Sequence, residues 1–356
     1  MSFYEKITII IHTKDRPWFL LRVIKYYNEK LGSVGINVII LDCSNDENFL
    51  IISDELSRKS YKLRPRVLHH SPSSSLTNRF VDALELISTP YVLLAADDDL
   101  YFFDWLKDAV ELLDSDVSYG IVYGHTIRFE LDQYKHYGKL IKIDFSKPNP
   151  PARWLEGDTP LERLTELGKS DWTTMGWYAL QRTELLSVII RNAKKYKLND
   201  RHIEILSIFC QTALSKTKML DKIYLARQDC VKTKRQYTSF KKEEEAFKKV
   251  MDVSASILSQ HKNIEMKLAA SMVENVFRVE LDQRKQNDSR KYIRTIADFF
   301  PFLRELKYRF NSFMIEKHFK LDPLLPDVRF PATPNISLDH PKIKELIEIV
   351  TSVENI

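Results

Sequence analysis

The sequence TPYVLLAADDDLYFFDWL, residues 89–106, joins a short apolar run to three consecutive aspartates. The apolar run at 91–95 predicts a buried β-strand, which would carry Asp97, Asp98 and Asp99 at its end. Carboxylates in that position are hard oxygen ligands and suit a divalent cation that carries phosphates. Because like charges repel one another, adjacent aspartates also favour a bound cation. A second interpretation stays open, in which this is a polar turn and Asp99 caps the following helix.

The composition is that of a compact protein. The chain has 356 residues, enough for one large domain or two ordinary ones, and 44% of them are hydrophobic. The net charge of +5 suits anionic partners such as a nucleotide or an anionic lipid surface, but the mixed charges give little support for nucleic-acid binding. No apolar run reaches the ~18 residues of a membrane span. The cysteines show no CxxC spacing, so we expect reduced thiols in a cytoplasmic protein: Cys43, Cys210 and Cys230.

Short apolar runs alternate with amphipathic segments through the first 130 residues or so. The apolar runs are short and rich in β-branched residues, so they predict strands, and the segments between them have helical spacing. This alternation predicts an α/β fold, a three-layer sandwich around a mainly parallel sheet. The predicted strands are 7–11, 37–44, 66–70, 91–99 and 119–130, and the predicted helices include 17–31, 46–59 and 104–114.

Polar clusters follow three of the predicted strands. They lie at 12–16, at 42–44 and at 97–99. Ligands of open α/β sheets bind at the carboxyl ends of the strands, so we expect these three clusters to meet at one edge. Another helix is expected after the polar loop at 71–76, with Ser75 or Thr77 as its cap.

The second half of the chain is less regular. Residues 131–170 contain the helix-breaking stretch KPNPPARW, and we expect an irregular loop there that covers a substrate or has no role. A helix is predicted at 198–216 and a last strand at 218–228. We divide the chain into an α/β domain, 1–238, and a charged, amphipathic helical region, 239–356, with a last short helix near 342–350.

The order of these motifs resembles that of family-2-like glycosyltransferases. ITIIIHTKDRP is similar to their first strand and loop, although His12 and Asp15 replace the usual Pro and Asn. VIILDCSND resembles their second strand, and LTNRFVDALELISTPYVLLAADDD resembles their helix and the strand that ends in DxD. The usual Gly-rich patch before the helix is missing, and SPSSS stands in its place. The likeness covers residues 5–125 well and 170–235 loosely.

The resemblance implies a GT-A fold and the transfer of a sugar from a nucleotide-sugar donor, with a UDP-sugar favoured. It also implies Mg²⁺ or Mn²⁺ bridging the donor diphosphate, with Asp97 and Asp99 as its ligands. An ordinary turn for Asp42 and a helix cap for Asn78 remain as alternatives, and Arg227 is a further candidate for the diphosphate. The residues that would contact the donor are Thr13, Arg16, Asp42, Ser44, Asn78, Arg79, Asp97 and Asp98.

An inverting transfer also needs a base that takes the proton from the acceptor hydroxyl. The resemblance places it at a helix start, where Glu204 is the first candidate and Asp200 the second. Acceptor contacts are expected from Asp171 and two tryptophans, because aromatic rings stack on sugars, although core packing is the competing role. The tryptophans are Trp172 and Trp177, with Tyr178 beside them. His125 and His202 could each be a third metal ligand, but a lone histidine is more often structural.

The leading hypothesis is thus a metal-dependent glycosyltransferase for a bacterial-type surface glycan. Its acceptor would be a glycan or a lipid-linked glycan. The helical region would contact the acceptor, an anionic inner membrane face or a second copy in a homodimer. A nucleotidyltransferase is the second hypothesis, but such enzymes generally need a Gly-rich phosphate loop that HTKDRP lacks. A non-catalytic glycan-binding protein on the same fold is the third.

Overall fold

The computed structural model describes residues 2–132, 135–145, 155–168, 174–229, 240–278 and 340–351. In these ranges nine strands form one sheet, in the order β3-β2-β1-β4-β8-β6-β9-β5 with β7 beside β6. The strands are β1 (Ile7–Thr13), β2 (Asn37–Asp42), β3 (Arg66–His69), β4 (Tyr91–Ala96), β5 (Asp99–Tyr101), β6 (Tyr119–Leu131), β7 (Leu140–Phe145), β8 (Leu180–Arg182) and β9 (Lys216–Gln228).

The sheet is mainly parallel, as the sequence predicts. β1 pairs in parallel with both β2 and β4, and β2 with β3. β8 is antiparallel to both β4 and β6, so β6 runs in the direction of β4, and β9 is parallel to β6. Only the short β8 and the outer strands β5 and β7 run the other way among the described strands. The apolar β-branched sequence of β1 is buried on both faces, which is typical of a central parallel strand.

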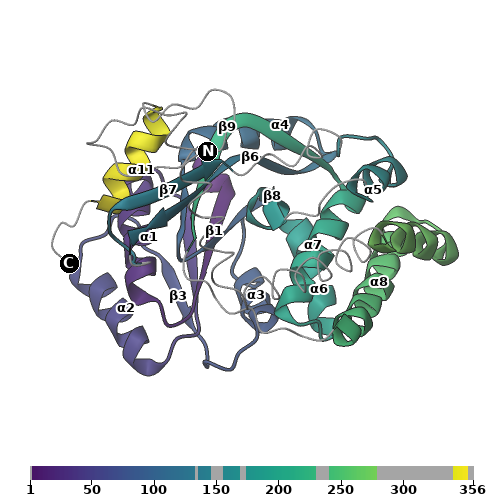
Figure 1. Cartoon of the computed structure of the whole chain (residues 1–356), viewed down its shortest axis with the longest axis horizontal. Coiled ribbons are helices and arrows are strands. Elements are labelled where there is room, and N and C mark those ends of the chain that lie inside the picture. The colour runs from purple at the N-terminus through teal and green to yellow at the C-terminus, as the bar shows by residue number, and fades with distance from the viewer. Residues whose placement is uncertain are drawn as a thin grey trace, which may run out of the picture.

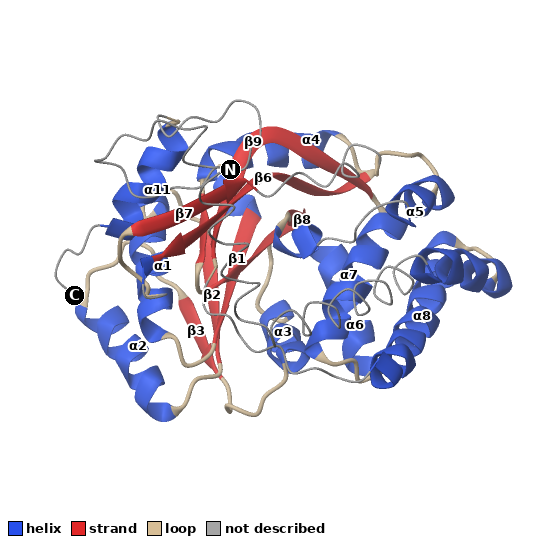
Figure 2. Cartoon of the chain, in the orientation of Figure 1, coloured by secondary structure: helices blue, strands red, loops and turns tan. Residues whose placement is uncertain are grey.

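Helices cover both faces of the sheet. α1 and α2 lie on one side of β1 to β3, and α3, α6 and α7 lie on the other (Figures 1 and 2). The labelled helices are α1 (Pro17–Leu31), α2 (Asp46–Arg58), α3 (Leu76–Leu84), α4 (Leu106–Ser115), α5 (Pro160–Gly168), α6 (Thr183–Lys195), α7 (Asp200–Leu214), α8 (Phe240–Lys262) and α11 (Pro341–Thr351), and residues 266–278 are also helical. The three-layer α/β prediction is therefore confirmed.

Local sequence explains where several helices begin. Pro17 opens α1, since proline suits the first helical turn, where its missing N–H costs nothing. The side chains of Asn45 and Asn199 accept hydrogen bonds at the starts of α2 and α7. Ser75, rather than Thr77, caps α3 by accepting from the N–H of Asn78. The starts of α1, α2 and α3 also fix the ends of the loops that leave β1, β2 and β3.

The predicted strand over 91–99 is wrong in its second half. β4 ends at Ala96, and Asp97 and Asp98 form a turn. Asp99 then begins β5, which pairs with β9 far along the chain. Asp99 does not cap a helix, because its Oδ2 accepts from the N–H of Ala96 at 3.0 Å. The pairing of β5 with β9 sets the position of Asp99, and no local sequence pattern predicts that pairing.

The irregular loop expected over 131–170 is also only partly correct. β6 continues to Leu131, β7 pairs with it, and α5 packs against α7. In β7 the apolar residues Ile141, Ile143 and Phe145 alternate with Lys142 and Asp144, the period of a strand with one buried face. The stretch KPNPPARW, 147–154, lies outside the described residues.

The C-terminal helices lie against the α/β part in two separate places. α8 packs on α7, and its buried side chains include Phe247 and Leu258. α11, predicted at 342–350, lies instead near α1 and β7 (Figure 1), where Glu345 pairs with Lys30. The predicted division at 238/239 stays a prediction. None of the described helices is long and apolar enough to cross a membrane.

Candidate functional site

The register of the sheet brings the three predicted polar clusters to one edge. Thr13, the last residue of β1, lies opposite Asp42, the last of β2. His12 lies opposite Ala96, so Asp97 follows directly beside Thr13. Parallel strands that start in register also end together, and the loops after them therefore converge.

Arg16 and Thr13 hold the first two aspartates. The Arg16 guanidinium lies 2.8 Å from Asp97 Oδ1 and 2.9 Å from Asp98 Oδ2, so it bridges both carboxylates. Thr13 Oγ1 donates to Asp97 Oδ2 at 2.7 Å. The same guanidinium packs over the Phe19 ring, at 4.1 Å from its centre. One cation is thus shared between two acids, and its flat face rests on an aromatic ring.

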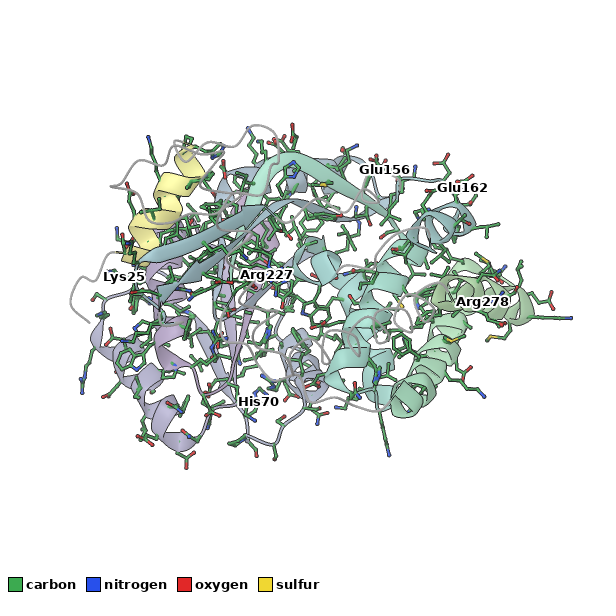
Figure 3. All side chains as sticks on the ribbon, in the orientation of Figure 1. Lys25, His70, Glu156, Glu162, Arg227 and Arg278 are labelled. Atoms are coloured by element: carbon green, nitrogen blue, oxygen red, sulfur yellow. The ribbon has the colours of Figure 1, made fainter. Side chains whose placement is uncertain are left out.

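A second arginine holds Asp99. Arg227 lies opposite Asp99 in the β5–β9 pair, and its Nε is 3.4 Å from Asp99 Oδ1. Its guanidinium stacks on the Tyr178 ring at 4.3 Å. Figure 3 shows Arg227 in the middle of the molecule, among the strands rather than at the rim. Two arginines therefore flank three aspartates at this edge.

The folded protein disfavours the ionised forms of Asp97 and Asp99. Burial, and then the neighbouring Asp98, raises the pKa of Asp97 to about 7, although Arg16 and Thr13 oppose the shift. Burial raises the pKa of Asp99 to about 6, against the charge of Arg227. The ionised forms of both carboxyls are disfavoured by burial and would gain from a further positive charge.

The aspartates fit part of a metal site. Among the described residues, no group of three or more His, Cys, Asp and Glu side chains is arranged to hold a metal ion. Asp99 Oδ1, however, is buried and accepts no hydrogen bond. Asp97 and Asp99 thus suit a divalent cation that takes its other ligands from phosphate and water. The two candidate histidines have other neighbours, since His125 contacts Asp221 and His202 packs against Phe247.

Asp42 is fully buried and its carboxylate is occupied within the protein. Its Oδ1 accepts from Ser44 Oγ at 2.6 Å and from Ser44 N at 3.3 Å. Its Oδ2 lies 2.6 Å from His69 Nδ1. Ser44 Oγ accepts in turn from the N–H of Asp15, whose φ of 53° lies in the left-handed region. This network ties the loop after β1 to the ends of β2 and β3.

The sequence analysis missed His69. The only signal was its place at the end of a short predicted strand, RVLHH, that did not look buried. Because β3 is the next parallel strand after β2, its last residue reaches the same edge, and His69 lies opposite Asp42. Any polar residue at the end of that strand was a candidate for the site.

Of the two predicted residues on α3, Arg79 has a structural contact, and Asn78 leaves its side chain exposed. The backbone N–H of Asn78 binds the Ser75 cap, and its side chain is exposed. Arg79 is buried, and its Nη1 lies 3.5 Å from the carbonyl oxygen of Leu41 in β2. Arg79 therefore holds α3 against the sheet beneath the site.

The base candidates at the start of α7 differ in their surroundings. Asp200 Oδ1 accepts from the N–H of Leu76 at 3.2 Å, so this carboxylate supports the start of α3. Glu204 is partly buried, and its charge acts on Tyr178 together with those of Asp99 and Asp98. Glu204 lies on α7, which packs against residues 174–178, the segment that contains Tyr178.

Of the three residues predicted to contact the acceptor, only Trp177 lies within the described residues. Trp177 is 1% exposed and packs edge-on against Phe80 at 5.4 Å. Its prediction as a sugar-stacking ring is wrong, because the indole lies in the core. Asp171 and Trp172 lie outside the described residues.

Comparison with known proteins gives likeness of structure only. No family model and no curated protein matches the sequence. Among solved structures, S. aureus TarS is similar with a TM-score of 0.47 and 16% identity over 76% of this chain, which spans only 43% of that chain. TarS 1–349 in complex with UDP-GlcNAc gives 0.48 and 16%, covering 78% and 73% of the two chains. Glucosyl-3-phosphoglycerate synthase from Mycobacterium tuberculosis, in complex with Mn²⁺, UDP and phosphoglyceric acid, gives 0.40 and 12%, covering 71% and 78%.

Proposed function

We propose that this protein is a glycosyltransferase that moves a sugar from a nucleoside-diphosphate sugar, UDP-linked by preference, to a hydroxyl of a glycan or lipid-linked acceptor. One observation carries the proposal. Three strand ends gather Thr13, Arg16, Asp42 and the aspartates at one edge, and two arginines flank the acids. A site that alternates acids with arginines suits a ligand that is itself a metal-bound anion.

The two arginines are the proposed ligands of the diphosphate. Arg16 has a side chain that is 33% exposed, so its guanidinium can turn from the carboxylates to a phosphate without leaving a buried cavity. Arg227 is set from the other side by Asp99 and the Tyr178 ring. Fork-shaped donors of this kind bind phosphate oxygens in pairs. Two cations on opposite sides of the diphosphate would orient the donor for the transfer step.

Asp97 and Asp99 are the proposed ligands of Mg²⁺ or Mn²⁺. When bound, the cation would offset the negative charge that develops on the departing nucleoside diphosphate. Thr13 keeps Asp97 in one orientation through its hydroxyl.

Glu204 is the proposed base. It would accept the proton of the acceptor hydroxyl as that oxygen attacks the anomeric carbon and the bond to the diphosphate breaks. Attack from the face opposite the leaving group would invert the configuration at that carbon. Glu204 is partly buried on α7, which packs against residues 174–178, and Arg227 stacks on the Tyr178 ring of that segment; this packing supports the assignment.

The competing functions receive less support. The loop after β1 contains no glycine, whereas the phosphate loops of nucleotidyltransferases generally need one. A non-catalytic binding protein would not need acids whose pKa values are raised by burial and by the neighbouring acid, since such acids lower the stability of the fold.

Thermal unfolding with and without Mn²⁺ tests the proposal. We expect the melting temperature to rise with UDP and a UDP-sugar, more in the presence of the metal, and less with CMP or inorganic phosphate. Release of UDP from a UDP-sugar in the presence of glycan acceptors would establish the reaction class. A chain that no nucleoside diphosphate stabilises, with any divalent metal, is not this enzyme.

A further inference from the structure

His69 is held in one orientation from two sides. Its Nδ1 lies 2.6 Å from Asp42 Oδ2, and its ring stacks on Phe49 with centres 3.9 Å apart and planes 16° apart. The side chain is still 28% exposed. Its other nitrogen, Nε2, is 4.0 Å from the exposed carboxylate of Asp46. A half-buried imidazole with a fixed ring and one outward nitrogen is a group prepared to contact a ligand.

The hydrogen bonds assign the protons of this histidine. A carboxylate can only accept, so the short contact to Asp42 requires that His69 Nδ1 carries a hydrogen. In the neutral ring Nε2 then has the lone pair and is an acceptor. Asp42 itself is 0% exposed, and Ser44 fills its second oxygen. Asp42 and Ser44 are therefore positioning residues, because both oxygens of Asp42 already accept hydrogen bonds within the protein.

We propose that His69 Nε2, and not Asp42, recognises the nucleobase of the donor by accepting a hydrogen bond from a ring N–H. This inference rests on the proposed function and specifies its donor. Uracil offers such an N–H between its two carbonyl groups. Cytosine has a lone pair on the same ring nitrogen, so two acceptors would face each other, which is costly in a partly buried site. The site thus selects for uridine over cytidine nucleotides.

The position of His69 agrees with the length of a nucleotide. Thr13, Asp42 and His69 lie side by side across β1, β2 and β3, at the edge that also carries Asp97. Neighbouring strands are about 4.8 Å apart, so the imidazole is about 10 Å from the β1 end. A nucleoside spans such a distance between its base and its phosphates. The base would lie at β3 and the diphosphate between β1 and β4.

Binding of three nucleotides to the full chain tests the assignment. With Mn²⁺ present, we expect calorimetry to give an affinity for UDP about 10-fold or more above those for N3-methyl-UDP and CDP, because the two analogues lack the ring N–H. Equal affinity of the unmodified protein for UDP and N3-methyl-UDP would overturn the inference while the proposed function stands. If none of the three binds, both fail.

Substitutions at His69 separate recognition from folding. In His69→Asn the amide can still donate to Asp42, as Nδ1 does, but the outward acceptor is lost. We expect this variant to keep its melting temperature within a few degrees and to bind the three nucleotides with similar affinity. His69→Gln places an amide oxygen near the Nε2 position and should restore part of the preference for UDP. Full discrimination in His69→Asn would refute the role of Nε2.

The neighbouring His70 provides the matched control. Its Nδ1 contacts the carbonyl oxygen of Leu68 and its Nε2 contacts Asp82, and it lies at the lower rim of the molecule in Figure 3. We expect His70→Asn to leave the ratio of UDP to CDP affinity unchanged. A loss of selectivity in this variant as well would mean that the loop after β3, and not the His69 imidazole, sets the preference.

Discussion

One buried arginine, Arg163, and the pair Arg16 and Arg227 have opposite surroundings. Arg163 lies where α5 meets α7, and its hydrogen bonds go to backbone carbonyl oxygens and not to acids. The four acceptors are the carbonyl oxygens of Gly157, Asp158, Thr212 and Ala213. Arg16 and Arg227 instead face acids whose pKa values are raised despite the nearby cations. Around Arg163 each guanidinium nitrogen has at least one carbonyl acceptor, so the side chain holds α5 and α7 together. Around Asp97, Asp98 and Asp99 the two arginines balance the negative charge only in part. A bound cation or ligand can supply the remaining stabilisation.

The largest effect is expected on stability, at Arg163. Arg163→Met should remove four hydrogen bonds and leave buried carbonyl groups unpaired, at a cost of about 3–5 kcal/mol in the free energy of unfolding. Urea titration followed by circular dichroism measures this loss. Arg191→Met is the control, since Arg191 is exposed and donates to Ser187 on its own helix. A similar loss in both variants would break the comparison.

The next effect is expected on catalysis, beside the acids. Glu204→Gln should lower kcat by about 10²–10⁴-fold, because the amide cannot take the acceptor proton. The affinity for UDP and the melting temperature should stay near those of the unmodified protein. Sugar transfer in a single-turnover assay measures the change. Glu184→Gln, at the exposed first turn of α6, is the control, and equal turnover in the two variants would remove Glu204 from the mechanism.

The pH dependence of stability tests the imbalance directly. The pKa of Asp97 in the folded state is raised to about 7, so its contribution to stability is complete below the unfolded pKa of 3.8 and is lost as the pH rises through 7. Without metal or nucleotide, the unmodified protein should lose about 1–3 kcal/mol from this acid between pH 5 and pH 8. Asp97→Asn should lack that loss.

A carboxyl with the opposite shift is the control for this pH profile. The pKa of Asp114 is lowered: burial acts against the shift, but hydrogen bonds from Lys6 and Tyr91 outweigh it. Its contribution is therefore present above the unfolded pKa and lost only as the pH falls below it. Asp114→Asn should leave the slope between pH 5 and pH 8 unchanged. Parallel profiles for Asp97→Asn and the unmodified protein would contradict the strained-acid description.

The smallest effect is expected from the hydroxyl that orients Asp97. Thr13→Val keeps the shape of the side chain and removes the 2.7 Å hydrogen bond. We expect a change of about 1 kcal/mol in unfolding free energy and a several-fold weaker dependence of UDP binding on Mn²⁺. Calorimetry at a series of Mn²⁺ concentrations measures this dependence. An unchanged metal response would show that Thr13 does not prepare Asp97 for a cation.

Sequence alone predicted most of the fold and part of the site. The strand at 7–11, the helix from Pro17 and the helix at the C-terminal end follow from local patterns, and all appear near the expected bounds. The edge that gathers Thr13, Asp42 and Asp97 followed from one further rule, that parallel strands present their ends together. His69 and the burial of Trp177 did not follow, because each depends on a partner distant in the sequence.

The chain by itself thus determined the alternation of strands and helices and the presence of three aspartates after a buried strand, because period and composition are local properties. Only the tertiary structure decided what those aspartates face. The turn at Asp97 and the pairing of Asp99 with Arg227 arise from the contact of β5 with β9, and the orientation of His69 arises from Asp42 on the neighbouring strand. The charge balance of a site is set by groups that meet in space, and strand pairing over long sequence distances brings them there.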